Sequence, residues 1–278
     1  MTKWMEFECR PDADLGSVDL GSLTPEALAG LSGDEVQKLP LGGTRHAARV
    51  GDVFFVRGTA VDAAVRLVAG PVRLDGVGRG MRTGRIEVIG AAGHWCGQDM
   101  VGGELVVRGD AGHAVGVGQR GGRIAVQGSV GDYTGGVSER SGRSMRGGDL
   151  LVEGSAGRFV GERLRRGMIL IGGSAGELGA AGMIAGTIVV LGGIGEHWAG
   201  GMRRGSVVLR QGATAGGWLA ELTEPRAFEL SFLSLMWKYL RGIAGDLAVE
   251  LPRTRWASRS VGDLSCGGVG EVLSVRME

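Results

Sequence analysis

Cysteine is scarce in this 278-residue sequence, and its three copies lie far apart. Cys9, Cys96 and Cys266 form no CxxC pair and no cluster with histidine, which excludes a disulfide framework and an iron–sulfur or structural zinc site. No run of 18 apolar residues occurs, and the first residues lack the basic-then-apolar pattern of a signal peptide. We therefore expect a soluble cytoplasmic protein with no membrane span and no metal site.

Lysine and net charge are also low. Lysine supplies three of the 31 basic residues, arginine supplies the others, and the net charge is only +1. This balance does not favour binding to nucleic acid through overall charge. Arginine favours planar, bidentate recognition of carboxylates or phosphates. The sequence thus predicts local arginine sites and no general polyanion-binding surface.

Catalytic patterns are missing as well. The serines lack a GxSxG elbow, and the acidic residues form no coherent pair for acid–base work. Glycine motifs at Gly76 and Gly116 look like dinucleotide fingerprints, but the second belongs to a repeat and precedes a strand, so we expect no bound cofactor. His94, His113 and His197 hold nearly the same place in their repeats, and His197 is too distant to complete a metal site. We expect no catalytic residues, and a structural role for these histidines.

Glycine, in contrast, is abundant, with 56 copies. A short aliphatic strand ending in glycine recurs eight times, and the closing glycines are Gly70, Gly90, Gly109, Gly128, Gly154, Gly172, Gly192 and Gly212. Units of this length are too short for a βαβ crossover. The period predicts an all-β fold, a right-handed parallel β-helix with coils of about 19 to 20 residues. A longer interval places an inserted loop over 135–148.

The regions outside the repeat complete the predicted organisation. We expect an entry segment over 1–58, the β-helix over 59–220, an amphipathic helix over 221–245 and a C-terminal extension over 246–278. Thr223 is the predicted helix cap, with Pro225 in the first turn. The predicted apolar face of this helix is Phe228, Phe232, Leu235, Met236, Tyr239 and Leu240, broadened by Leu230, Leu233 and Trp237.

Alternate strand positions predict what this helix covers. Outward residues of six strands form an apolar stripe, which must be buried. We expect the helix to pack on this stripe and to present its remaining apolar side to another subunit. The stripe consists of Val106, Ala125, Leu151, Leu170, Val189 and Val208.

One row of arginines follows from the same period. The position two residues before the strand-opening glycine carries, in order along the chain, Arg82, Val101, Arg120, Arg146, Arg165, Ile184 and Arg203, with Arg166 and Arg204 alongside. Like charges stacked in consecutive coils require anions nearby. One interpretation is neutralisation by neighbours such as Asp149 and Glu162, together with solvent screening. The other is contact with an acidic partner surface or a polycarboxylate ligand.

Several segments outside the repeat carry a family resemblance. They are SLTPEALAGLSGDEVQKLPLGGTR from Ser22, GDVFFVRG from Gly51, RSMRGG from Arg143 and VGDLSCGGVGEVL from Val261. Together with the repeats, they resemble the C-type subunit of formylmethanofuran dehydrogenase and of the related formyltransferase/hydrolase complex of methylotrophic bacteria. The repeats are less similar to the GXGXG domain of the glutamate synthase large subunit.

The resemblance implies a noncatalytic scaffold subunit of a hetero-oligomeric enzyme complex in one-carbon metabolism. In the favoured reading, the complex converts formyl-tetrahydromethanopterin to formate through formylmethanofuran during formaldehyde oxidation, and zinc lies in another subunit. Carriers of the methanofuran type bear glutamate tails, so Arg120, Arg146, Arg165 and Arg203 would guide the tail or meet an acidic partner.

Other readings stay open. The first alternative is the C-type subunit of a molybdenum or tungsten formylmethanofuran dehydrogenase, and the second is a free-standing GXGXG domain of a glutamate synthase. A hexapeptide acyltransferase is disfavoured because the aliphatic residues cluster once per coil. A carbohydrate-active β-helix is disfavoured because aromatic residues make up only 5% of the chain.

Overall fold

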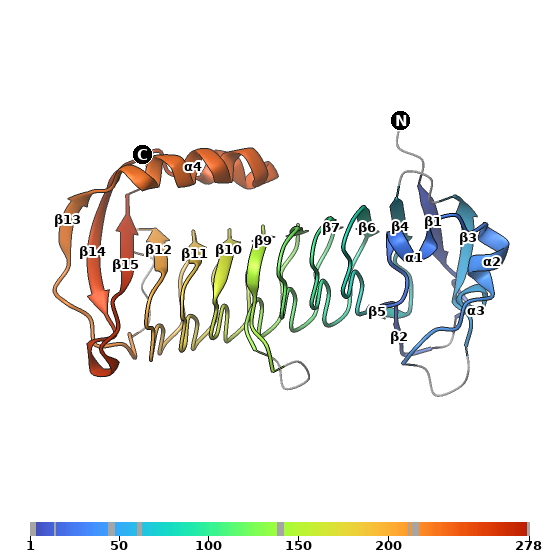
Figure 1. Ribbon diagram of the computed structural model, residues 1–278, viewed down its shortest axis with the longest axis horizontal. Helices are drawn as coiled ribbons and strands as arrows, with labels where there is room; N and C mark the ends of the chain where they lie inside the picture. Colours follow the sequence, from blue (N-terminus) through green and yellow to red (C-terminus); the bar gives the residue numbers. More distant parts are fainter. Residues whose placement is uncertain are drawn as a thin grey trace.

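The protein is mostly β, and one open, mixed sheet of 13 strands runs along its length (Figure 1). This computed structural model describes residues 4–13, 15–43, 48–59, 63–137, 142–210, 212 and 217–276. The strands of the sheet are β1 (Met5–Cys9), β3 (Phe54–Gly58), β4 (Ala64–Val68), β6 (Arg85–Ile89), β7 (Glu104–Val107), β8 (Arg123–Val126), β9 (Arg146–Val152), β10 (Arg166–Ile171), β11 (Thr187–Val190), β12 (Ser206–Arg210), β13 (Arg226–Glu229), β14 (Trp256–Gly262) and β15 (Gly270–Val275). A second sheet pairs β2 (Ser17–Asp19) with β5 (Arg73–Asp75).

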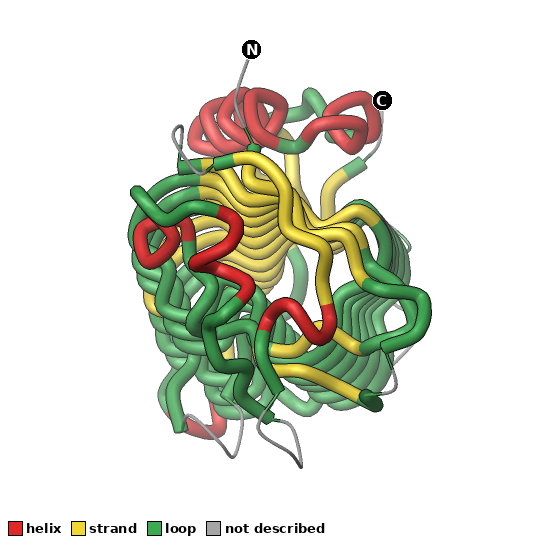
Figure 2. Tube along the Cα trace, turned by 90° about the vertical axis from the view of Figure 1, so that its right-hand side faces the viewer, coloured by secondary structure: helices red, strands yellow, loops and turns green. Residues whose placement is uncertain are grey.

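The eight strands predicted from the repeat are all present as β4 and β6 to β12. Neighbours along this series pair in parallel, so that Ile169 lies opposite Ile188, and Ile188 opposite Val207. These inward side chains are fully buried and continue as one core along the molecule. Bridges between turns form a second parallel ladder from Ala111 to Ile194. Figure 2 shows strands and turns of successive repeats lying over one another.

Side chains at the turns also join successive repeats. The Nδ1 atom of His94 accepts a hydrogen bond from the backbone N–H of His113 at 2.9 Å, and that of His113 accepts from Asp132 at 2.8 Å. The two imidazole rings stack with centroids 5.0 Å apart, which confirms their predicted position in adjacent repeats. His197 does not share that position. It has the positive φ of the next residue in the turn, as Trp95 does.

Short helices lie beside the N-terminal end of the sheet, and one longer helix lies along its face toward the other end (Figure 1). At the N-terminal end, β1 lies between β3 and β4, beside three short helices. The helical elements are α1 (Pro25–Leu28), α2 (Gly33–Gln37), α3 (Val50–Val53), α4 (Ser231–Ile243) and the 3-10 helices η1 (Gly245–Glu250) and η2 (Leu264–Cys266). Within the described ranges, no helix is both long and apolar enough to cross a bilayer.

Helix α4 packs on the outer face of the sheet, as predicted. Its buried residues are Leu233, Met236, Trp237 and Leu240. They form one cluster with the strand residues Leu151, Leu170, Val189 and Val208. Ala125 is only partly buried against this cluster, and Val106 is buried outside it.

Two details of the predicted helix are wrong. It begins at Ser231, well after Thr223, because 226–229 pair as β13 with β14 and Thr223 donates its N–H to Val261. The predicted face is also only partly buried: Phe232, Leu235 and Tyr239 remain exposed. The buried residues instead follow the i, i+3, i+4, i+7 spacing that starts at Leu233.

Candidate functional site

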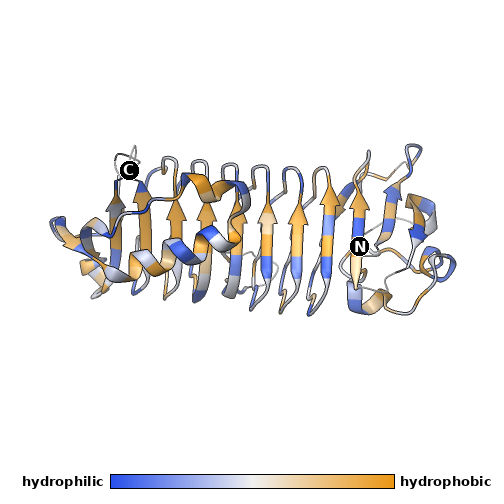
Figure 3. Ribbon diagram, turned by 90° about the horizontal axis from the view of Figure 1, so that it is seen from above, coloured by the Kyte–Doolittle hydropathy of each residue, from blue (hydrophilic) through white to orange (hydrophobic). Residues whose placement is uncertain are grey.

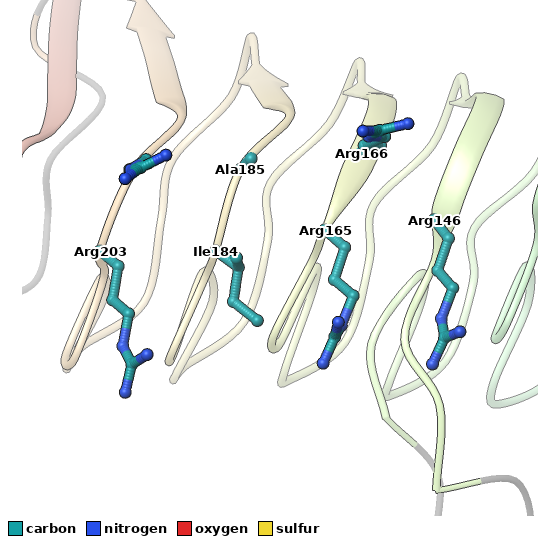
Figure 4. Close-up of a pocket in the computed structure, with 7 residues that line it drawn as sticks. Arg146, Arg165, Arg166, Ile184, Ala185 and Arg203 are labelled. Atoms are coloured by element: carbon teal, nitrogen blue, oxygen red, sulfur yellow. The ribbon is translucent and has the colours of Figure 1, made fainter.

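An arginine-lined groove of about 480 Å³ runs along one edge of the repeats. We call it the arginine groove. Figure 4 shows the side chains of Arg146, Arg165 and Arg203 pointing in the same direction, with Ile184 between the last two. The lining residues are Arg146, Arg165, Arg166, Ile184, Ala185, Arg203 and Arg204.

The repeat itself positions the first row of the groove. Backbone N–H groups donate to the preceding repeat: Arg165 to Met145 at 3.1 Å, Ile184 to Leu164 at 2.8 Å and Arg203 to Met183 at 2.8 Å. Each member of the row is thus one repeat from the next, as the sequence predicts.

Arg120 occupies the adjoining rung of this row. The N–H of Arg146 donates to the carbonyl of Gln119 at 2.6 Å, which places Arg146 one repeat beyond Arg120. Arg120 is exposed but does not line the groove. The structure therefore brings three of the four predicted arginines together, along with Arg166 and Arg204, which the sequence places beside the row.

A second row, formed by Arg166, Ala185 and Arg204, is peculiar to these repeats. The equivalent positions of the three preceding repeats are glycines, and a Cβ at Gly121 or Gly147 would collide with a backbone carbonyl of the preceding repeat. The pairing of β9 and β10 shifts register just after Arg166. A bulge of this kind redirects a side chain locally. The groove is therefore a local departure from the repeat.

The guanidinium groups of the groove lack carboxylate neighbours. Among the described residues, no carboxylate oxygen lies within 4.0 Å of these five groups. Asp149 accepts a hydrogen bond from Tyr239 at 2.7 Å. Glu162 lies 3.9 Å from Arg163, and burial raises the pKa of its carboxyl despite that charge. Neither acid neutralises the groove, so local neutralisation does not explain the row.

Cross-strand pairing concentrates this charge further. Arg146 and Arg166 lie opposite each other in β9 and β10. Like charges directly opposite in a sheet repel. Guanidinium forks without acidic neighbours bind carboxylates through paired N–H donors. The arrangement is therefore suited to an anionic ligand or an acidic surface.

The residues most open to a catalytic or metal-binding reading have structural roles. The Nδ1 atoms of His94 and His113 accept backbone hydrogen bonds. Cys96 is fully buried, and burial raises the pKa of its thiol to about 12, so the reactive thiolate is suppressed. Among the described residues, no group of three or more His, Cys, Asp and Glu side chains is placed to hold a metal ion.

Of three comparisons with known proteins, two found a relative, and these two agree. No protein-family model matches the chain. Over 76 residues it is 42% identical to the C-type Fhc subunit of the formyltransferase/hydrolase complex of Methylorubrum extorquens, an alignment that covers 27% of this chain and 28% of that protein.

The structural comparison covers almost the whole chain. A chain in the crystal structure of the formyltransferase/hydrolase complex FhcABCD from the same organism, in complex with methylofuran, is similar with a TM-score of 0.85 and 36% identity. The match covers 98% of this chain and 99% of that chain.

Proposed function

The chain belongs to the C-type subunit family of formyltransferase/hydrolase complexes, and from that premise we propose that it is the noncatalytic scaffold subunit of such a complex. The observation that carries this proposal is the agreement with a chain of FhcABCD over nearly the full length, at 36% identity. In the proposed complex, formyl-tetrahydromethanopterin is converted to formate through a formylated methanofuran-type carrier. Chemistry and zinc belong to other subunits, and the complex is cytoplasmic.

The proposed scaffold is a right-handed parallel β-helix. Three features support it: the parallel register of β4 and β6 to β12, the second ladder of bridges between turns, and the continuous core inside both. In this proposal, the described parts of the entry segment (1–58) and of the extension (246–278) close its ends. The exposed side of α4, with Phe232, Leu235 and Tyr239, faces another subunit in this proposal.

Co-purification tests the scaffold role. The tagged chain, expressed in its source organism at native levels, is expected to bring down the other subunits of the complex. Metal analysis of the purified complex then separates the hydrolytic complex from the dehydrogenase, because a dehydrogenase contains molybdenum or tungsten. A tagged chain recovered alone, with its own activity, would contradict the proposal.

The arginine groove is proposed to hold the acidic tail of the carrier. Methylofuran is present in the related complex, and the five guanidinium groups fit a tail rich in carboxylates because no carboxylate of the described residues approaches them. The tail supplies only anionic groups here. The groove binds and orients it, while the formyl group reacts in other subunits.

Replacing Arg120, Arg146 and Arg165 together by alanine tests this role. We expect weaker carrier binding by the assembled complex, with unchanged thermal unfolding of the chain, because all three side chains are exposed. A control variant lacking Arg57, Arg158 and Arg253, which are exposed outside the groove, is expected to bind normally. Unchanged carrier affinity of the first variant at low salt would refute the tail-binding role.

A further inference from the structure

The arginine groove is divided into two clusters. Arg146, Arg165 and Arg166 lie on one side, and Arg203 and Arg204 lie on the other. Between them, a single repeat contributes Ile184 to the first row and Ala185 to the second (Figure 4). Both rows of basic residues are thus interrupted at the same repeat.

The interruption sets a distance between the clusters. Successive repeats are hydrogen-bonded through their backbones, and neighbouring strands of a sheet are spaced about 4.8 Å. Arg165 and Arg203 are two repeats apart, so their backbones are separated by roughly 10 Å. Two anionic groups bound by the two clusters must be separated by a comparable length.

The middle repeat disfavours an anion. Ile184 and Ala185 are half-buried apolar side chains and offer no side-chain donor to a carboxylate. A carboxylate above them would lose water without gaining a partner, whereas a methylene chain would lose nothing by lying there. The groove therefore differs from a continuous basic track, which would accept a uniform polyanion.

We infer that the arginine groove binds a flexible chain with two carboxylates separated by an apolar spacer that crosses Ile184. Each arginine cluster takes one carboxylate, and binding of the first raises the effective concentration of the second at the other cluster. This inference rests on the proposed function, because the chain would be part of the carrier tail. An acidic segment of a partner subunit would have the same chemistry.

Dicarboxylates of different length test the spacing. The probes are succinate, glutarate, suberate and azelate, titrated calorimetrically into the full chain at low salt. We expect suberate or azelate to bind about tenfold more tightly than succinate, since only the longer acids reach both clusters. Octanoate, with one carboxylate and a similar apolar chain, is expected to bind like succinate. Equal affinities for all lengths, or no binding at all, would overturn the inference.

Two variants make the test specific. Removing both Arg203 and Arg204 is expected to abolish the preference for longer acids by eliminating one cluster. Ile184→Arg fills the gap and is expected to remove the advantage of the longer acids, because the row of arginines then runs without interruption from Arg146 to Arg203. Arg203 and Arg204 are exposed and Ile184 is half-buried, and thermal unfolding checks that each variant retains the fold. An unchanged optimum in Ile184→Arg would contradict the two-cluster arrangement.

The assembled complex identifies the source of the ligand. If the carrier tail occupies the groove, suberate competes with carrier in the complex. If a partner segment occupies it, suberate binds the free chain and not the complex. Failure of the chain to assemble with other subunits would refute the proposed function. If the unmodified chain showed no preference for the longer dicarboxylates, only this inference would be refuted.

Discussion

The outer face of the large sheet has two halves, one covered by a helix and the other carrying paired charges. Beneath α4, the outward column consists of Leu151, Leu170, Val189 and Val208, all buried by the helix. Further along the same column, β4 and β6 carry Arg66 and Glu87, and no helix lies over them (Figure 3). We refer to these as the covered half and the open half.

Ion pairing explains why the open half needs no helix. Glu87 is 6% exposed and lies 2.9 Å from both Arg66 and Arg108. The three side chains form hydrogen bonds with one another across neighbouring strands, so the charge of Glu87 is neutralised without a covering helix. The comparison shows that the repeat specifies the sheet, while the outward residues of each half specify what covers it.

The largest expected effect comes from removing the cover. Trp237 is fully buried in α4 and donates its indole N–H to the carbonyl of Thr254 at 3.1 Å. Trp237→Ala is expected to lower the free energy of unfolding by about 3 to 5 kcal/mol, measured by urea denaturation. Leu235→Ala is the control, since Leu235 is 71% exposed on the same helix and should change little. Similar losses in both variants would contradict the assigned helix face.

A smaller effect is expected in the connection between β14 and β15, at the same end of the sheet as the covered half. Asp263 is 3% exposed and accepts hydrogen bonds from the N–H groups of Gly201, Glu221 and Ser265. Burial raises the pKa of its carboxyl, but a hydrogen bond from the Ser265 hydroxyl at 2.6 Å and these three backbone bonds together outweigh burial and lower the pKa to about 2. The resulting stabilisation, at most about 2 kcal/mol, is present above the unfolded-state pKa and is lost as pH falls through 2. Denaturation of Asp263→Asn at pH 5 and at pH 2 measures this contribution. The drop in unfolding free energy between these pH values should be smaller in the variant than in the unmodified chain. An equal drop in both would refute the contribution of Asp263.

Breaking the ion pairs probes the open half. Burial raises the pKa of Glu87, yet its hydrogen bonds from Arg108 and Arg66 outweigh burial and hold the pKa below its usual value. Glu87→Gln should cost about 1 to 2 kcal/mol of unfolding free energy at pH 7. Glu8→Gln is the matched control, because Glu8 and Arg57 form an exposed pair at 3.4 Å that contributes little. Equal costs in the two variants would show that burial of Glu87 is unimportant.

The smallest expected effect is a pH dependence of local stability at His94, between β6 and β7. Burial, helped by Arg73 and His113, lowers the pKa of His94, so stability falls as pH drops below the unfolded value of about 6.5. A neighbouring row of contacts between the turns uses Ser155 and Ser174, which do not titrate. The protection of the His113 amide against hydrogen exchange, relative to its intrinsic rate at each pH, should therefore be lower at pH 5 than at pH 8, whereas the protection of Ser174 should not change. An equal loss of protection at both residues would refute a histidine origin.

Local patterns were sufficient for the strands but not for the start of α4. Alternating aliphatic residues and closing glycines depend only on neighbours in sequence, so all eight repeat strands were predictable. Thr223 and Pro225 formed a credible helix start, yet 226–229 pair with a strand 30 residues later in the chain. Long-range pairing overrode the local signal. His197 was misplaced by one position because the turn register depends on backbone φ, which the residue type did not reveal.

The sequence by itself determined the stacked repeats and the rows of arginine, because periodic spacing brings equivalent residues into line. Only the tertiary structure decided which arginines have no acidic neighbour and which half of the sheet α4 covers. Arg66 and Arg108 meet Glu87, whereas Arg165 and Arg203 meet no carboxylate of the described residues. Charge neutralisation depends on distances of a few ångströms between side chains from different repeats, and those distances exist only in the folded chain.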